Sequence, residues 1–241
     1  GIHWKGIYIQ STSVKNTISY ADISYAGNSE MGFSDFANKK TNLGLNNEAK
    51  LNLENSIIRK SSGYGMYIRY GVLETFTENT FRNNTNAAAG LNATQAANLD
   101  EATIFNGNGW DGAEVFNSNV TKEDTWVNLN NDASYHIIGN ISITEGGLTL
   151  KPGATLKFDE DVFLDVQNSS YLSAVGTSSD MITFTTSDEA GQIYWKGIRF
   201  KTANSQNKLE YVHVNYGGGA KHGLNNFENV KTAISGNNNG N

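Results

Sequence analysis

Hydrophobic and polar residues alternate along this chain in short runs, and clusters of Asn, Gly and Ser separate one run from the next. Residues 50–53, 65–68 and 162–166 are clear examples. Alternation of this kind is the pattern of a half-buried β-strand, and the Asn and Gly residues between the runs favour tight turns. A helical pattern is absent apart from residues 87–97, which could form a turn or two of helix. We therefore expect almost entirely β-structure.

Two segments of the chain repeat one another. Residues 1–27 align without a gap with residues 192–218, at an offset of 191 residues (1 to 192). The identical pairs include Trp4 with Trp195, Tyr20 with Tyr211, and Tyr25 with Tyr216. Residues 44–47 then recur as residues 223–226, at an offset of only 179 residues (44 to 223). The smaller offset predicts that residues 28–41 are a loop-like insertion in the first copy.

A finer period lies within each copy. Residues 54–57 return as residues 78–81, which is a spacing of 24 residues (54 to 78). A parallel β-helix is built from stacked rounds (rungs) of about this length, each with three short strands. The repetition is needed because the strand edges of one round stay unpaired until the next round stacks on them. The predicted fold is therefore an all-β parallel β-helix, a solenoid whose tandem units repeat at an offset of about 191 residues.

The predicted organisation is a tandem array. Residues 1–123 would be the C-terminal part of a first β-helix unit, and residues 124–241 the N-terminal part of a second unit. Residues 91–123 are either a connecting region or further rounds of one continuous solenoid. Because each end of the chain then lies inside a repeat unit, neighbouring repeat units of a longer chain are expected partners.

The string GLTLKPGATLKF at residues 147–158 resembles the first strands of bacterial right-handed parallel β-helix surface proteins. Residues 172–177, 182–185, 195–198 and 209–217 follow in the order that this family shows. The resemblance implies a right-handed β-helix of the superfold that also contains pectate lyases, in a protein that is secreted or lies at the bacterial cell surface. It brings no lyase motif. The Asn-Thr-Asp, Gly-His-Gly and Arg-Ile-Lys signatures of polygalacturonases are absent, and a fold alone implies no activity.

The composition of the chain excludes several classes of function and cofactor. The chain has no cysteine, which excludes thiol catalysis, iron–sulfur clusters and zinc sites built from cysteine. Its formal net charge of -6 argues against a nucleic-acid partner. No apolar run approaches the roughly 18 residues that a membrane-spanning helix needs. No nucleotide, haem or flavin is expected, and the four histidines lack the spacing of metal ligands.

The outward-facing positions of the two copies differ. Asp22, for example, aligns with His213, whereas the inward-facing positions stay apolar. This difference favours a repeated scaffold over a repeated ligand site. Trp4 and Trp195 could stack on sugar rings, but their shared Trp-Lys-Gly-Ile setting at a strand start favours a structural role. The four repeated tyrosines are expected to form aromatic stacks in the interior of the solenoid or at its corners.

A group of basic residues around a tyrosine is the predicted ligand site. Its members are Arg59, Lys60, Tyr67, Arg69 and Arg82. Strand alternation over residues 64–70 turns Tyr67 and Arg69 outward. The 24-residue period places Arg82 one round from Ile58 and therefore close to Arg59. Such a group suits the carboxylates of a polyuronate, and Tyr67, Arg69 or Arg59 could act as the base in a β-elimination. The alternative is an ordinary solvated basic face.

Calcium is a weak candidate. Asp159 and Asp161 offer hard oxygen ligands, but their spacing fits no defined calcium loop, and a solvated turn is the alternative. We expect an extracellular structural or adhesive surface module that presents a long face, with a polysaccharide or cell-surface glycan as its partner, and without catalysis. The alternative function is a polysaccharide lyase or glycoside hydrolase that acts on an acidic polysaccharide. A spacer without a ligand is the third possibility.

Overall fold

The computed structural model describes residues 3–31, 39–221 and 230–236. In these residues nearly all regular structure is β-strand, and the strands of each sheet run parallel, so the prediction of an all-β parallel fold is confirmed. The described part contains one short helix, α1 (Ala93–Ala96), inside the segment whose pattern allows a helical turn. No helix in the described ranges is long and apolar enough to cross a membrane.

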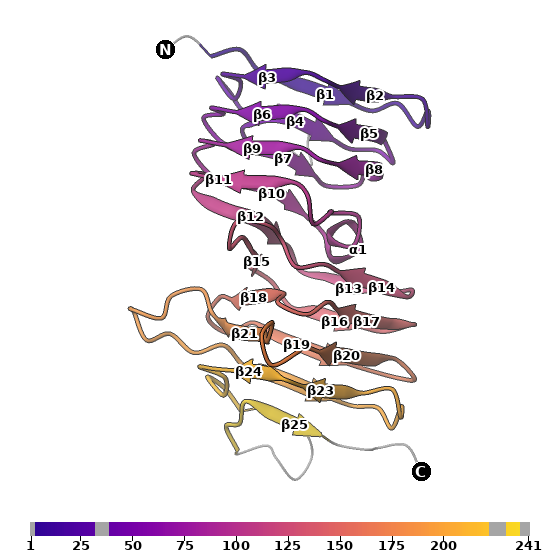
Figure 1. Ribbon diagram of the computed structural model, residues 1–241, viewed down its shortest axis with the longest axis vertical. Helices are drawn as coiled ribbons and strands as arrows, with labels where there is room; N and C mark the ends of the chain where they lie inside the picture. Colours follow the sequence, from indigo (N-terminus) through magenta and orange to yellow (C-terminus); the bar gives the residue numbers. More distant parts are fainter. Residues whose placement is uncertain (1–2, 32–38, 222–229, 237–241) are drawn as a thin grey trace. The chain divides into compact units, whose positions relative to one another are not determined.

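Contacts within the chain divide it into two compact units. Unit 1 comprises Gly1–Glu114 and Leu129–Ala133, and unit 2 comprises Val115–Asn128 and Ser134–Asn241. In both units, consecutive strands belong to different sheets (Figure 1). Each described strand therefore pairs with a strand of a neighbouring round, and the next strand in sequence belongs to another sheet.

Unit 1 has three parallel sheets, which the chain visits in turn. The first sheet contains, in spatial order, β1 (Ile7–Ile9), β4 (Thr41–Leu45), β7 (Tyr64–Ile68), β10 (Ala87–Leu91) and β12 (Trp110–Val115). The second contains β2 (Thr17–Ser19), β5 (Lys50–Glu54) and β8 (Val72–Thr77). The third contains β3 (Asp22–Ser24), β6 (Ile57–Arg59), β9 (Thr80–Arg82) and β11 (Ile104–Asn106).

Unit 2 is built in the same manner from three groups of parallel strands. The first group contains β15 (Ser134–Ile137), β18 (Thr155–Phe158), β21 (Ile182–Thr186) and β24 (Val212–Val214). The second contains β13 (Ser118–Val120), β16 (Ile141–Ile143), β19 (Phe163–Val166), β22 (Gly197–Phe200) and β25 (Ile234–Gly236). The third contains β14 (Asp124–Trp126), β17 (Gly147–Leu150), β20 (Tyr171–Val175) and β23 (Lys208–Glu210).

Inward-facing side chains of the third sheet form part of the core of unit 1. Ile23 pairs with Ile58, Ile58 pairs with Phe81, and Phe81 pairs with Phe105. The Phe81 ring stacks on the rings of Phe105 and of Phe76 in β8, with centroids 5.9 Å apart in each case. Parallel, in-register pairing brings the same position of each round into contact, so apolar residues stack on apolar residues.

A ladder of amide side chains satisfies the backbone at the turns from the third sheet to the first sheet of unit 1. Asn42 Nδ2 lies 3.3 Å from Asn84 Oδ1, and Asn84 Nδ2 donates to Asn108 Oδ1 at 2.8 Å. Asn108 Nδ2 donates in turn to Asp111 Oδ1 at 2.7 Å. Each amide also hydrogen-bonds a backbone carbonyl of the third sheet. Buried turns require such partners, because unpaired polar groups there would destabilise the fold.

Residues that lie 191 positions apart make the same local contacts in the two units. Trp4 Nε1 donates to the carbonyl of Ser24 at 2.8 Å, and Trp195 Nε1 donates to the carbonyl of Asn215 at 2.8 Å. The backbone amide of Trp4 donates to the carbonyl of Tyr25 at 3.1 Å, and that of Trp195 donates to the carbonyl of Tyr216 at 3.1 Å. The sequence identities therefore correspond to matching local structure.

The expected insertion at residues 28–41 is wrong. Thr41 Oγ1 donates to the carbonyl of Leu43 at 2.9 Å, and 191 residues later Thr232 Oγ1 donates to the carbonyl of Ile234 at 2.8 Å. The ungapped alignment thus continues past residue 27, and the intervening segments have equal length. The motif at residues 223–226 lies outside the described residues, and its identity with residues 44–47 does not mark equivalent positions.

Candidate functional site

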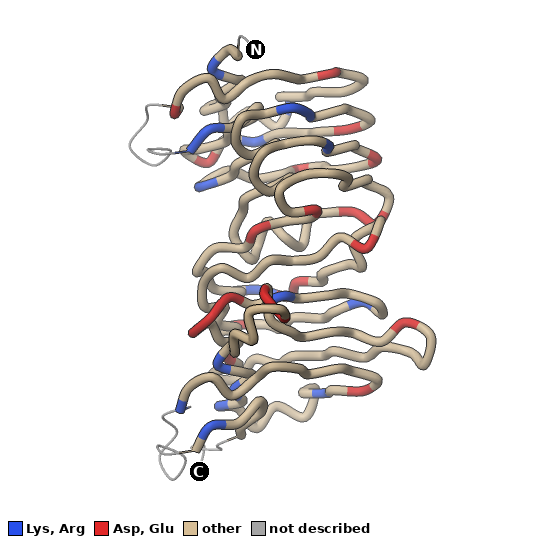
Figure 2. Tube along the Cα trace, turned by 90° about the vertical axis from the view of Figure 1, so that its left-hand side faces the viewer, with Lys and Arg blue, Asp and Glu red and all other residues tan. Residues whose placement is uncertain are grey.

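The strongest candidate site lies on the outward side of the third sheet of unit 1. There Arg59 of β6 pairs in register with Arg82 of β9. The 24-residue period would place Arg82 opposite Ile58, but the pairing is one residue different, since Ile58 opposes Phe81. Ile58 and Phe81 turn into the core. The arginines that follow them in sequence therefore point outward, from paired strands whose backbones lie about 4.8 Å apart. Figure 2 marks the Lys and Arg positions of this unit in blue.

Arg59 is held by an acidic partner from the neighbouring strand. Its Nε donates to Asp22 Oδ1 at 2.9 Å, and its Nη2 donates to Asp22 Oδ2 at 2.8 Å. These hydrogen bonds hold the pKa of the Asp22 carboxyl below its usual value, and the charges of Arg82 and Lys60 act in the same direction. The ion pair neutralises Arg59 and fixes the direction of its guanidinium group.

Arg82 has no such partner. Its side chain is exposed, and no hydrogen bond or ion pair holds its guanidinium group within the part of the chain that the structure describes. Like charges directly opposite one another on paired strands are unfavourable. The carboxylate beside Arg59, Asp22, already binds that arginine on both of its oxygens. Arg82 is therefore available to an anion from outside.

The tyrosine beside these cations is Tyr25. It follows β3 at a turn, is 42% exposed, and accepts a hydrogen bond on its hydroxyl from Lys60 Nζ at 2.7 Å. Hydrogen bonding by Lys60, followed by the positive charge of that residue, lowers the pKa of Tyr25. The rings of Tyr25 and His3 also meet edge to face, with centroids 5.9 Å apart.

We call this group the cationic face. Its members are Asp22, Tyr25, Arg59, Lys60 and Arg82. Asp22 and Tyr25 do not belong to the group predicted from sequence. The sequence signal for Tyr25 is the order Ile, polar residue and turn residue at positions 23–25, which recurs at positions 58–60.

Tyr67 lies on a different sheet and Arg69 follows its strand, and the expected exposure of Tyr67 is wrong. Tyr67 belongs to β7 and is only 5% exposed, because the Tyr64 ring packs against it at 5.2 Å and Lys39 Nζ lies 5.6 Å from its ring centroid. Burial raises the pKa of the Tyr67 hydroxyl, which opposes a role as a base at neutral pH. Arg69 is half-buried and covers the ring of Tyr70 at 5.1 Å.

A buried tyrosine–carboxylate pair lies beside Tyr67. Tyr64 donates its hydroxyl proton to Glu114 Oε2 at 2.6 Å, across the intervening strand β10. Burial, and then the hydrogen bond to Glu114, raise the pKa of Tyr64. The hydrogen bond links the outward side chains of β7 and β12. The two residues are 50 residues apart in sequence, so local patterns could not have paired them.

The carboxylates of Asp159 and Asp161, in the acidic turn of unit 2, already interact with side chains of the protein itself. Asp159 Oδ1 lies 2.6 Å from His136 Nε2 and 2.6 Å from the Ser187 hydroxyl. Burial acts to raise the pKa of Asp159, but the hydrogen bonds from these two residues lower it overall. Asp161 points to solvent, with Lys196 Nζ 3.8 Å away. The described residues contain no cluster of three or more His, Asp or Glu side chains that could hold a metal ion.

The two repeated tryptophans differ in exposure. Trp195 is completely buried and stacks on Phe158 with centroids 4.1 Å apart, so it belongs to the core of unit 2. Trp4 is 43% exposed, although its indole nitrogen is hydrogen-bonded.

Comparison of the chain with protein-family models, with curated protein sequences and with solved structures finds no match.

Proposed function

We propose that each unit is a segment of a right-handed parallel β-helix, and that the two are tandem copies at an offset of 191 residues (1 to 192). The cyclic order in which the chain visits three sheets supports the helix, and the shared contacts of Trp4 and Trp195 support the repeat. The resemblance of residues 147–158 to bacterial surface proteins of this fold favours an extracellular setting.

The function that we propose for this module is adhesion to an acidic polysaccharide through the cationic face, without catalysis. The observation that carries it is the exposed, unpaired guanidinium group of Arg82 directly beside Arg59. A guanidinium group matches the two oxygens of a carboxylate, and a polyuronate offers one carboxylate on each sugar. Because Asp22 neutralises Arg59, Lys60 adds a second positive charge to that of Arg82, next to the hydroxyl of Tyr25.

The direct test is the affinity of the chain for soluble polygalacturonate, measured by titration calorimetry. Removing the charged side chain in Arg82→Ala should weaken binding about 10-fold or more, because hydrogen bonds to charged groups contribute about 1.5–3 kcal/mol. Arg69→Ala removes the same charge outside the cationic face, at the end of β7, and should leave the affinity unchanged. Equal affinities of wild type and Arg82→Ala would refute the proposal, and so would the absence of binding by wild type.

A second candidate is a polysaccharide lyase in which Tyr25 acts as the base. The lowered pKa of the Tyr25 hydroxyl favours this role over one for Tyr67, whose pKa is raised. Absorbance of unsaturated sugar products, after incubation with polygalacturonate with and without calcium, decides between the two functions. A rising signal that Tyr25→Phe abolishes would establish elimination, whereas a flat signal leaves binding alone.

A further inference from the structure

Four exposed or half-exposed tyrosines occupy equivalent turns in the two units. They are Tyr20, Tyr25, Tyr211 and Tyr216, with φ angles of 52°, 61°, 49° and 56°. In unit 1 the first two flank β3, and in unit 2 the last two flank β24. Each pair is offset by 191 residues from the other (20 to 211, 25 to 216).

The backbone conformation of these turns does not favour tyrosine. All four residues are in the left-handed region, where Gly and Asn are the residues of low strain. The equivalent turns of later rounds in unit 1 hold polar residues or glycine and no aromatic residue. Asn55 (φ 48°) and Glu78 (φ 53°) correspond to Tyr20, and Lys60 (φ 54°), Asn83 (φ 56°) and Gly107 (φ 70°) correspond to Tyr25. A tyrosine that is repeated in both units, at turns where later rounds hold polar residues or glycine, indicates a use for the ring itself.

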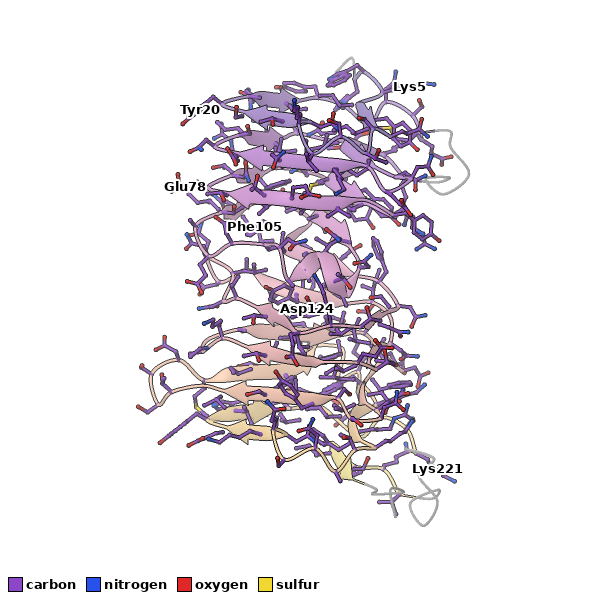
Figure 3. The ribbon with its side chains drawn as sticks, turned by 90° about the vertical axis from the view of Figure 1, so that its right-hand side faces the viewer. Lys5, Tyr20, Glu78, Phe105, Asp124 and Lys221 are labelled. Atoms are coloured by element: carbon purple, nitrogen blue, oxygen red, sulfur yellow. The ribbon has the colours of Figure 1, made fainter. Side chains whose placement is uncertain are left out.

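The rings also gain little from the fold. Tyr20 is 84% exposed and Tyr211 is 51% exposed, and in the described parts of the chain no ring contact or side-chain hydrogen bond holds either of them. Tyr20 stands at the outer margin of unit 1 in Figure 3. Tyr25 and Tyr216 are partly supported, by Lys60 and by the Tyr194 ring respectively. Exposed aromatic surface of this kind is unfavourable in water and is available to a ligand.

We propose that each tyrosine pair is a double stacking platform for one extended polysaccharide chain that runs along the strand between the two rings. Five residues of nearly extended backbone place the Cα atoms of the two tyrosines about 16 Å apart, a distance that a rod-like chain of several sugars can span. The inference rests on the proposed adhesive function; it shares Tyr25 with the cationic face but does not need the positive charges of that face. A ring face recognises the C–H surface of a pyranose whether or not the sugar carries a charge.

The residues between the rings favour a carbohydrate over a protein partner. In unit 1 the outward-facing positions of β3 are Asp22 and Ser24, and in unit 2 the corresponding positions are His213 and Asn215. Isolated rings separated by polar side chains suit a ligand with hydroxyl groups between flat apolar faces. A protein interface would instead need a contiguous apolar centre.

The test uses asparagine in place of tyrosine, because asparagine tolerates the left-handed turn and the fold should keep or gain thermal stability. The probes are soluble polygalacturonate, soluble mixed-linkage β-glucan, insoluble cellulose and chitin. We expect wild type to bind at least one probe, and the double variant Tyr20→Asn/Tyr211→Asn to bind it about 10-fold more weakly or worse. The control is Tyr70→Asn, which changes a tyrosine that is 52% exposed but lies outside the pairs.

Several outcomes would overturn the proposal. The proposal fails if wild type binds none of the four probes, or if the double variant binds as well as wild type. Concentration-dependent self-association that the double variant loses would assign the rings to a protein contact instead. If Arg82→Ala binds as well as wild type while the tyrosine variant loses binding, the role of the cationic face is refuted and the stacking platforms are supported. If Arg82→Ala loses binding while the tyrosine variant binds as well as wild type, only the platforms are refuted.

Discussion

A tyrosine in unit 2 shows how single residues set the local structure of these sheets. Tyr171 pairs with Gly147 on the adjacent strand, and its ring lies across that glycine to donate a hydrogen bond to Glu123 beyond it. A Cβ atom at position 147 would lie inside the ring. The requirement for glycine is therefore steric, and it comes from a residue 24 positions later (147 to 171).

We predict that Gly147→Ala lowers the free energy of unfolding by about 2 kcal/mol, as overpacking of a closed site does. Urea denaturation of the single variant measures the loss. In the background of Tyr171→Ala the same change should cost almost nothing, because the clashing ring is gone. Equal losses in the two backgrounds would show that the ring is not the cause.

At the scale of elements, the third sheet of unit 1 depends on the amide ladder at its end. Asn84 is 2% exposed and joins Asn42, Asn108 and the backbone amide of Ser61. Its removal leaves several buried polar groups without partners at once, in consecutive rounds. A ladder of this kind sets the register of the strands that follow it, because each amide reaches only the next round.

Asn84→Ala is expected to lower the free energy of unfolding by about 3 kcal/mol, the combined effect of lost hydrogen bonds and stranded partners. Chemical denaturation followed by far-ultraviolet circular dichroism is the measurement. Asn106→Ala is the matched control, since Asn106 is exposed and lies outside the ladder. A loss as small as in that control would mean that water replaces the ladder without penalty.

For the whole molecule, the charge distribution opposes the proposed site. The chain carries a formal net charge of -6, whereas the cationic face is locally positive. At low ionic strength the Debye length is about 30 Å, so a polyanion is repelled by the entire molecule. At physiological salt it is about 8 Å, and the ligand is influenced mainly by the nearby cations.

The affinity for polygalacturonate should therefore pass through a maximum at intermediate salt and fall again at high salt, where the cationic face is itself screened. Titrations across a series of NaCl concentrations check this. Arg82→Ala should lower the maximum, and a neutral polysaccharide should show no maximum. Affinity that falls steadily from the lowest salt would mean that the net charge has no influence on binding.

Much of the fold follows from the sequence. Period-two alternation between Asn- and Gly-rich turns predicts the parallel strands and the inward positions such as Ile58 and Phe81, because a strand must bury one face. The identities between residues 1–27 and residues 192–218 indicate the matching contacts of Trp4 and Trp195.

Only the tertiary structure decided which residues meet. It paired Arg82 with Arg59 and not with Ile58, covered Tyr67, and placed Tyr25 against Lys60. The physical reason is that register between rounds depends on turn lengths and long-range packing, and a difference of one residue exchanges the inward and outward faces. Exposure of an outward residue likewise depends on what distant segments cover, which no local pattern encodes.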